Sequence, residues 1–265
     1  MCTVVQIQET ALNSMLSEER RRWILATLER DGKVVVSDLS RALEVSEDTI
    51  RRDLRELAAE GRVQRVHGGA LPAAPLSPNY AVRATQGAST KVTLARAAAS
   101  LVRPGTVVLV DGGTTNVEIV RQLPPDLVAT VVTNSLPVAL ALAGHARLEV
   151  ILLGGRVGKL SLATVDIVTV EGVRALRADL CFLGVCSVHP EAGVTTSEFS
   201  ESHLKRAMIS SSAEVVAVAL GEKLGTAAPH GVAPLSELTH LVTESSVTDE
   251  ELAPYRAAGV TVLRT

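Results

Sequence analysis

The sequence predicts an N-terminal winged helix-turn-helix followed by a larger C-terminal α/β domain, doubly wound around a parallel sheet. Arginine is dense from Arg20 to Arg65, in the part expected to form the small domain. Three prolines within residues 72–78 remove backbone donors and favour an extended chain, which predicts a linker. Continuous apolar runs then alternate with helical stretches. The expected N-terminal extension, winged domain, linker and α/β domain cover residues 1–15, 16–70, 71–86 and 87–265.

The composition limits the class of protein. With 265 residues, of which 46% are hydrophobic and 21% charged, the chain can bury a core. Aromatic residues make up only 2%, which argues against stacking on single-stranded nucleic acid. The net charge of −3 excludes a uniformly basic coat but allows a local basic face. The three cysteines form no CxxC pair, and neither a signal peptide nor a membrane-spanning stretch is expected, so a cytoplasmic protein is predicted.

The small domain is expected to contain three helices, a short strand and a strand that leads into a turn. Ser17, Ser37 and Ser46 each precede a helical stretch and are the expected N-caps, because a serine hydroxyl can accept a free amide hydrogen there. The order helix, strand, helix, helix, strand and turn is expected over residues 18–31, 33–36, 38–43, 47–60, 62–66 and 67–69. This is the order of a winged helix-turn-helix.

The third helix has the side chains that a DNA-reading helix needs. Ile50, Leu54 and Leu57 repeat at helical spacing and form its core face. The arginines near its start therefore lie off this face, where they can pair with guanine edges or hold phosphates. A solvated charged face would explain the helix alone, but the preceding helix and Arg65 in the wing favour DNA binding. The candidate DNA contacts are Ser37, Ser46, Thr49, Arg51, Arg52, Arg55, Arg65 and His67.

The apolar runs beyond the linker do not alternate with polar residues, which indicates strands covered on both faces of a parallel sheet. Strands are expected over residues 106–110, 131–133, 150–153, 180–185, 214–220, 240–243 and 260–263. Helices are expected over residues 91–102, 115–123, 136–143, 168–176, 200–211 and 248–257. Ligands of such folds bind beyond the C-terminal ends of the strands.

Three polar turns fall at those strand ends and predict an anion pocket. Their glycines let the backbone approach an anion, and the helix that follows presents free amides. Such turns also cap helices in any α/β fold, but three at one edge, with basic side chains available, favour a site for a small phosphorylated polyol or sugar. The candidate effector contacts are Asp111, Gly112, Gly113, Thr114, Thr115, Asn134, Ser135, Gly154, Gly155, Arg156, Glu201, Lys205 and Lys223.

The third helix and the wing resemble the DeoR/GlpR family of bacterial transcription regulators. The residues that carry this resemblance are Ser46, the run Thr49-Ile50-Arg51-Arg52-Asp53-Leu54, and the segment from Gly61 to Ala70. The turns at 111–115, 133–135 and 154–155, with Phe182-Leu183-Gly184, resemble the sensor domain of the same family. The resemblance implies a sensor similar in fold to ribose-phosphate isomerase and CoA-transferase-type domains. It also implies a repressor of a double-stranded DNA operator, controlled by a phosphorylated sugar or related metabolite.

Two half-sites on DNA favour at least a homodimer, and the resemblance adds a tetramer as an option. Three positions depart from the family pattern, which usually has an aspartate at Leu220, an Asn-Gly pair beginning at Cys186 and a glycine at Asp166. All three could border the pocket, and an acidic Asp166 near a phosphate would be unfavourable unless a cation paired with it.

Two other functions stay open. A sugar-phosphate isomerase would need a carboxylate base, for which Glu201 and Asp111 are the candidates, but it would not need a winged helix. The other alternative is a regulator whose sensor domain serves only for assembly. No catalytic residue, cofactor or metal site is expected, because the histidines are scattered and Cys181 and Cys186 lack partners at zinc spacing.

Overall fold

The chain forms two compact units, seen here in a computed structural model that describes residues 16–75 and 78–265. The expected extension over residues 1–15 lies outside the described residues. The winged-helix unit contains the described residues up to Ala74 together with Gly225–Ala227. The α/β unit contains Pro75–Leu224 and Ala228–Thr265.

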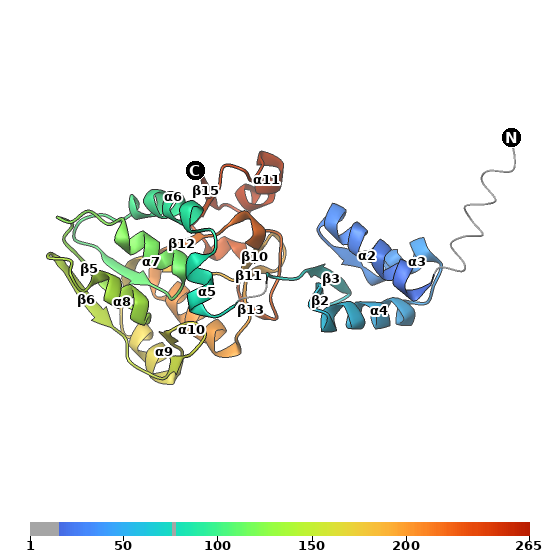
Figure 1. Cartoon of the computed structure of the whole chain (residues 1–265), viewed down its shortest axis with the longest axis horizontal. Coiled ribbons are helices and arrows are strands. Elements are labelled where there is room, and N and C mark those ends of the chain that lie inside the picture. Colours follow the sequence, from blue (N-terminus) through green and yellow to red (C-terminus); the bar gives the residue numbers. More distant parts are fainter. Residues whose placement is uncertain (1–15, 76–77) are drawn as a thin grey trace, which may run out of the picture. The chain divides into compact units, whose positions relative to one another are not determined.

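The winged-helix unit has three helices packed on a small antiparallel sheet (Figure 1). The helices are α2 (Ser17–Asp31), α3 (Val36–Leu43) and α4 (Glu47–Ala59), and the strands are β1 (Val34–Val35), β2 (Val63–Val66) and β3 (Gly69–Pro72). The strand order is β1-β3-β2, with β2 and β3 forming the wing. Ile24, Ile50, Leu54 and Leu57 are fully buried, so the apolar face predicted for the third helix faces the core.

The first and third helices begin in different ways. Ser46 caps α4 as predicted, because its hydroxyl accepts from the backbone N–H of Thr49 at 3.2 Å. The prediction that Ser17 caps α2 was wrong. The cap position belongs to Leu16, whose own N–H donates to the carboxylate of Glu19 at 3.1 Å. Glutamate in the first turn therefore supplies the oxygen that serine was expected to supply.

The prediction that Ser37 caps the second helix was also wrong. Helix α3 starts one residue earlier, after Val35. The N–H of Val36, at the start of that helix, donates to the carbonyl of Gly68 in the wing turn at 2.8 Å. A tertiary bond thus supplies the partner that a capping side chain would otherwise provide.

The α/β unit is built on a seven-stranded, fully parallel sheet of order β15-β14-β12-β9-β4-β5-β6. Its strands are β4 (Val107–Val110), β5 (Ala129–Thr133), β6 (Leu148–Leu152), β9 (Ala178–Leu183), β12 (Ser212–Val218), β14 (His240–Thr243) and β15 (Thr261–Arg264). Its longer helices are α6 (Ala88–Ala99), α7 (Thr114–Arg121), α8 (Leu136–Leu142), α9 (Ile167–Arg174), α10 (Phe199–Ser210) and α11 (Asp249–Ala257). The doubly wound parallel sheet predicted from the apolar runs is therefore confirmed.

Apolar cores lie on both faces of this sheet. Helices α6, α7 and α8 pack against one face, and α9, α10 and α11 pack against the other (Figure 1). Alternate residues of one strand serve both cores, since Val108 and Val110 of β4 face the first and Leu109 faces the second. This two-sided burial is why the strands are apolar without alternation.

Several smaller elements were not predicted. Helix α5 (Tyr80–Thr85) and the end of β3 lie within residues 71–86, which were expected to be linker throughout. Strands β7 (Val157–Gly158) and β8 (Ala163–Thr164) form a short hairpin. Strands β10 (Ser187–His189), β11 (Gly193–Thr196) and β13 (His230–Ala233) form a separate antiparallel sheet. Short elements of this kind bury too few apolar residues to leave a periodic pattern.

Candidate functional site

A buried ion pair fixes helix α4 in the winged-helix unit. Nε of Arg20, on α2, lies 2.5 Å from Oδ2 of Asp53, on α4, and Nη2 lies 3.0 Å from Oδ1. The hydrogen bond to Asp53 raises the pKa of Arg20 despite its partial burial. This bidentate contact lies on the buried side of α4, whereas the arginines of α4 itself are exposed.

The arginines of α4 form the candidate DNA surface. Arg51, Arg52 and Arg55 are all exposed on α4. Arg51 is held by two acidic residues of its own helix start, at 2.5 Å from Glu47 and 3.1 Å from Asp48. DNA phosphates or bases would have to replace these partners, and the ion pairs meanwhile keep the side chain near the start of the helix.

The wing joins this surface. A cleft in the winged-helix unit is lined by Arg51 from α4 and by Arg65 and His67 from the wing. Ser46 and Thr49 lie at the start of α4, where their hydroxyls are 3.0 Å apart. The remaining candidate contact, Ser37, is exposed on α3. The fold therefore gathers hydroxyls and positive charges at the start of one helix and the neighbouring wing.

The second candidate site is a pocket at the point where the strand order of the large sheet reverses. Strands β5 and β6 extend the sheet to one side of β4, while β9, β12, β14 and β15 extend it to the other. The loops that leave the C-terminal ends of β4 and β9 line the pocket, as the general rule for open α/β sheets predicts.

Asp111 is the centre of this switch point. Its side chain is buried and accepts hydrogen bonds from the N–H of Gly112 at 2.7 Å and from the N–H of Gly184 at 3.0 Å. A side chain at Gly184 would collide with the Gly112 carbonyl and the Asp111 carboxylate, so only glycine lets β4 and β9 approach this closely. Asn116 completes the junction by donating to the carbonyls of Asp111 and Phe182 at 3.0 and 3.1 Å.

Lys205 neutralises Asp111. Its ammonium group, buried on α10, donates to the Asp111 carboxylate. Burial alone would lower the pKa of Lys205, but the carboxylates of Asp111 and Glu201 outweigh it and hold the pKa above its ordinary value. Glu201, one turn earlier on α10, accepts from the hydroxyl of Thr196 at 3.0 Å. Lys205 therefore carries a positive charge that is already compensated.

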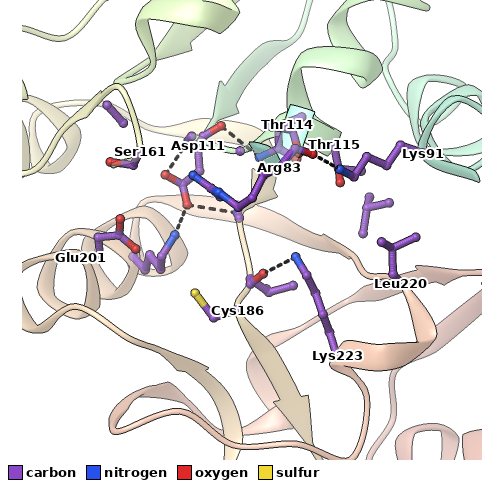
Figure 2. A pocket seen from close by; sticks show the side chains of 18 of the residues that line it. Arg83, Lys91, Asp111, Thr114, Thr115, Ser161, Cys186, Glu201, Leu220 and Lys223 are labelled. Carbon is purple, nitrogen blue, oxygen red and sulfur yellow. Dashed lines mark hydrogen bonds and ion pairs between the residues drawn. The ribbon is translucent and has the colours of Figure 1, made fainter. Parts of the chain in front are cut away.

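Three further cations surround the pocket (Figure 2). Nζ of Lys223 donates to the carbonyl of Val185 at 2.9 Å, and burial lowers the pKa of this lysine. Nζ of Lys91 donates to the carbonyl of Arg83 at 2.6 Å, and its pKa is lowered by burial and by the charges of Lys223 and Arg83. Sequence reasoning missed Arg83 and Lys91. The one signal for Lys91 was a lysine within a helix of mostly small and apolar residues, in which Arg96 is the other charged residue.

The structure brings together most of the predicted effector residues. Those that line the pocket are Asp111, Gly112, Gly113, Thr114, Thr115, Asn134, Glu201, Lys205 and Lys223. Ser135, Gly154, Gly155 and Arg156 are not among the lining residues. The hydroxyl of Ser135 instead accepts from the N–H of Val138 at 3.4 Å and caps α8.

The turn at Gly154, Gly155 and Arg156 is occupied by Asp166. The carboxylate of Asp166 accepts from the N–H of Arg156 at 2.7 Å and from the N–H of Thr169 at 3.2 Å. The hydrogen bond from Arg156 is the main reason that the pKa of Asp166 is lowered. Asp166 does not line the pocket, so an acidic group here caps α9 instead of facing a ligand.

The other two departures from the family pattern do line the pocket. Leu220 and Cys186 are both among its lining residues. The sulfur of Cys186 lies 3.6 Å from the hydroxyl of Thr196, whereas Cys181 is fully buried in β9. A leucine and a thiol thus take places where the family usually has polar amide or acidic side chains.

The described residues contain no group of three or more His, Cys, Asp or Glu side chains that could hold a metal ion. Within residues 16–75 and 78–265, no helix has the length and apolar character needed to cross a bilayer.

Comparison with known proteins gives a family match for each of the two parts of the chain. Residues 20–74 match the DeoR-like helix-turn-helix domain, and residues 86–245 match the DeoR C terminal sensor domain. The HTH-type transcriptional regulator GlpR of Haloferax volcanii is 35% identical over 252 residues, which cover 94% of this chain and 98% of the relative. The glycerol-3-phosphate regulon repressor of Escherichia coli is 28% identical, over 88% of this chain and 92% of the relative.

Among solved structures, ribose 5-phosphate isomerase A of Methanocaldococcus jannaschii matches 52% of this chain and 55% of its own, with 15% identity and a TM-score of 0.38. The family matches cover both the DNA-binding part and the sensor part. The chain belongs to the DeoR family of helix-turn-helix transcriptional regulators.

Proposed function

We propose that this regulator is a cytoplasmic repressor whose affinity for its operator changes when a small phosphorylated sugar or polyol occupies the pocket of the α/β unit. Residues 16–70 bind the operator through α4 and the wing, and residues 87–265 sense the effector and assemble the oligomer. The glycerol-3-phosphate regulon repressor is a relative whose name points to this class of compound. The effector contacts are the nine lining residues already predicted, with Arg83 and Lys91 added.

The observation that carries this proposal is the charge of the pocket. Lys205 is neutralised by Asp111, but Arg83, Lys91 and Lys223 also line the pocket. Burial lowers the pKa of both Lys91 and Lys223, and repulsion from the charge of Arg83 lowers both further, so an anion bound among these side chains would stabilise their protonated forms. A phosphate group would relieve this repulsion, and the start of α7 after Gly113 offers it free amides.

An enzymatic role has less support from this geometry. An isomerase needs a carboxylate that can take a proton from the substrate carbon. The carboxylate of Asp111 already accepts two backbone amides and the ammonium group of Lys205. Glu201 accepts from the Thr196 hydroxyl. We therefore propose that the pocket binds its ligand without turnover.

The α/β unit also carries an apolar surface that fits a second copy of the chain. We call it the α8–β6–α9 surface. Its residues, exposed by 39–78%, are Leu136, Leu140, Ile151, Leu152, Val157, Leu160, Ile167 and Val168. Helix α8 contacts β6, the last strand of the sheet, and α9 joins them through Asp166, which binds the turn after β6 (Figure 1). The N–H of Leu136 donates to the carbonyl of Leu162, which brings the loop that holds Leu160 beside the start of α8.

We propose that this surface is the homodimer interface. A stable dimer buries about 800 Å² on each partner, and eight large, half-exposed apolar side chains supply a large part of that area. An exposed edge strand such as β6 also has free backbone groups that a second copy can pair with. A dimer would present two recognition helices to two half-sites, as specific operator binding requires.

The function can be tested without knowledge of the target genes. Purified protein would first select DNA fragments from random-sequence duplexes. A selected fragment would then be titrated with the protein in the presence of inorganic phosphate, sn-glycerol 3-phosphate and a panel of sugar monophosphates, with the dephosphorylated compounds as controls. The proposal predicts that at least one phosphorylated compound shifts DNA affinity and is recovered unchanged. Turnover of a compound would favour the enzyme, and DNA binding that ignores the whole panel would favour a domain used only for assembly.

A further inference from the structure

Arg83 connects the pocket to the segment that continues into the winged-helix unit. It lies on α5, which begins at Tyr80, whereas the winged-helix unit ends at Ala74 in the same stretch of chain. Pro75 and Pro78, which lie between them, also line the pocket. Two residues of the stretch that leads to the DNA-binding unit, Pro75 and Pro78, therefore lie in the wall of the pocket.

Two buried polar atoms of this pocket have no hydrogen-bond partner. They are Nε of Arg83 and Oδ1 of Asn134, and both residues line the cavity. Asn134 is almost completely buried, and its Nδ2 already donates to the carbonyl of Thr164 at 3.0 Å. Nε is a charged donor, and Oδ1 is an acceptor. Because folded proteins rarely leave such atoms unpaired, they indicate a ligand with an acceptor for one and a hydroxyl for the other.

Two other polar atoms of Arg83 make hydrogen bonds. Its Nη2 donates to the carbonyl of Leu160 at 3.2 Å, and its own carbonyl accepts from Nζ of Lys91 at 2.6 Å. Figure 2 shows Arg83, Lys91 and Lys223 around the same cavity as Asp111. The charge of Arg83 lowers the pKa of both Lys91 and Lys223 by repulsion, so an anion bound beside Arg83 would relieve that repulsion, and Arg83 lies on the helix that follows the linker.

We infer that an anionic group of the effector binds Nε of Arg83 while a hydroxyl of the same molecule donates to Asn134, and that this clamp on α5 transmits occupancy of the pocket to the DNA-binding unit. The inference rests on the proposed function, which supplies the effector. It names the ligand class as a polyol with a terminal anion. A ligand changes DNA affinity only by the difference in its contacts between two states, and α5 is the contact that lies on the connecting path.

The test compares Arg83→Gln with Arg96→Gln, a matched control on α6 that is exposed and outside the pocket lining. The probes are inorganic phosphate, sn-glycerol 3-phosphate and glycerol, followed by whichever sugar phosphate shifts DNA affinity in the parent protein. Isothermal titration measures probe affinity, fluorescence anisotropy measures DNA affinity with and without probe, and hydrogen exchange follows the amides of residues 80–91. Circular dichroism confirms that each variant is folded, and Arg83→Lys keeps the charge as a second variant.

We expect Arg83→Gln to bind phosphorylated probes about ten- to hundredfold more weakly, as loss of a charge-assisted hydrogen bond predicts. At saturating probe, the DNA affinity of Arg83→Gln should stay at the value that this variant has without probe. Its backbone amides in residues 80–91 should gain no protection from hydrogen exchange. The probe affinity of Arg83→Lys should lie between those of the parent and of Arg83→Gln, and Arg96→Gln should match the parent in both probe affinity and DNA response.

The inference on Arg83 is overturned if Arg83→Gln binds the probe as tightly as the parent, or if saturating probe changes its DNA affinity as fully as in the parent. In that case the parent still responds, and the proposed function stands. If the parent itself binds no phosphorylated compound of the panel, the proposed function fails and takes the Arg83 inference with it.

Discussion

The ammonium group of Lys205 on α10 donates to the carboxylate of Asp111 at the end of β4, and the two side chains are only 7% and 4% exposed. Because Asp111 also accepts from the N–H of Gly184, the pair ties β4, β9 and α10 together at the switch point of the sheet. Because Asp111 already neutralises the charge of Lys205, an anionic ligand would bind to other cations of the pocket.

Removing one partner of this pair should destabilise the α/β unit strongly. Lys205→Met leaves a buried carboxylate without its cation, which typically costs about 3–5 kcal/mol. The double variant Asp111→Asn/Lys205→Met should lose less than the sum of the two single variants, because neither charge then remains unpaired. Urea unfolding followed by circular dichroism measures both effects, with Lys159→Met as an exposed control. Additive losses in the double variant would show that the pair is not coupled.

DNA binding should depend on the exposed arginines at the start of α4. We expect the Arg51→Ala/Arg52→Ala variant to lose specific binding, at about 1–3 kcal/mol for each base contact removed. A lost phosphate contact would instead weaken all sequences alike and reduce the salt dependence. Fluorescence anisotropy at several salt concentrations separates the two effects. Arg30→Ala, at the far end of α2, is the control, and a double variant with the affinity of the parent would exclude this surface.

Binding of phosphate should weaken as pH rises, and it should do so below the usual titration range of lysine. Burial lowers the pKa of Lys91 and Lys223, so their ammonium groups deprotonate earlier than ordinary lysines. An anion binds the protonated form, so affinity is present below these lowered pKa values and is lost as pH rises through them. Without a ligand the sign is reversed, because a lowered lysine pKa makes the folded state more stable as pH rises through it. Titration calorimetry over a pH series measures the affinity, and Lys91→Met/Lys223→Met should flatten the profile.

The oligomeric state should depend on the α8–β6–α9 surface. Leu140, the most exposed large apolar side chain on it at 78%, is replaced by aspartate. A charge at a buried interface is unfavourable, so light scattering should report a monomer at micromolar concentration and DNA affinity should fall. Val128→Asp, which changes an exposed valine outside this surface, should leave the assembly intact. A Leu140→Asp protein with the mass of the parent would place the interface elsewhere.

Local patterns predict much of this fold, because its main elements are stabilised by their own apolar residues. The strand predicted over residues 240–243 is observed as β14. Ser46 caps α4 because the free N–H of Thr49, three residues later in the chain, donates to its hydroxyl. In contrast, Ser37 does not cap α3, since the wing turn supplies a carbonyl for the first helical amide. The sequence around a serine does not indicate a partner that arrives from a distant turn.

The candidate sites depend still more on distant partners. Arg20 and Asp53 are 33 residues apart, and Asp111 and Lys205 are 94 apart, so neither ion pair follows from local spacing. The turn at Gly155 has the glycines of an anion site, but the carboxylate of Asp166 already accepts from the N–H of Arg156 in this turn. Arg83 was missed because it lies in a stretch that was expected to be an extended linker and that forms α5 instead.

The central claim is that occupancy of an anionic pocket changes the affinity of the winged helix for DNA. The most direct measurement is the fluorescence anisotropy of a selected DNA duplex titrated with full-length protein, with and without each phosphorylated compound and its dephosphorylated counterpart. We predict that at least one phosphorylated compound shifts the DNA dissociation constant by about fivefold or more, the usual range of allosteric coupling, while its counterpart has no effect. A DNA dissociation constant that stays the same across the whole panel, although the protein binds DNA specifically, would contradict the account.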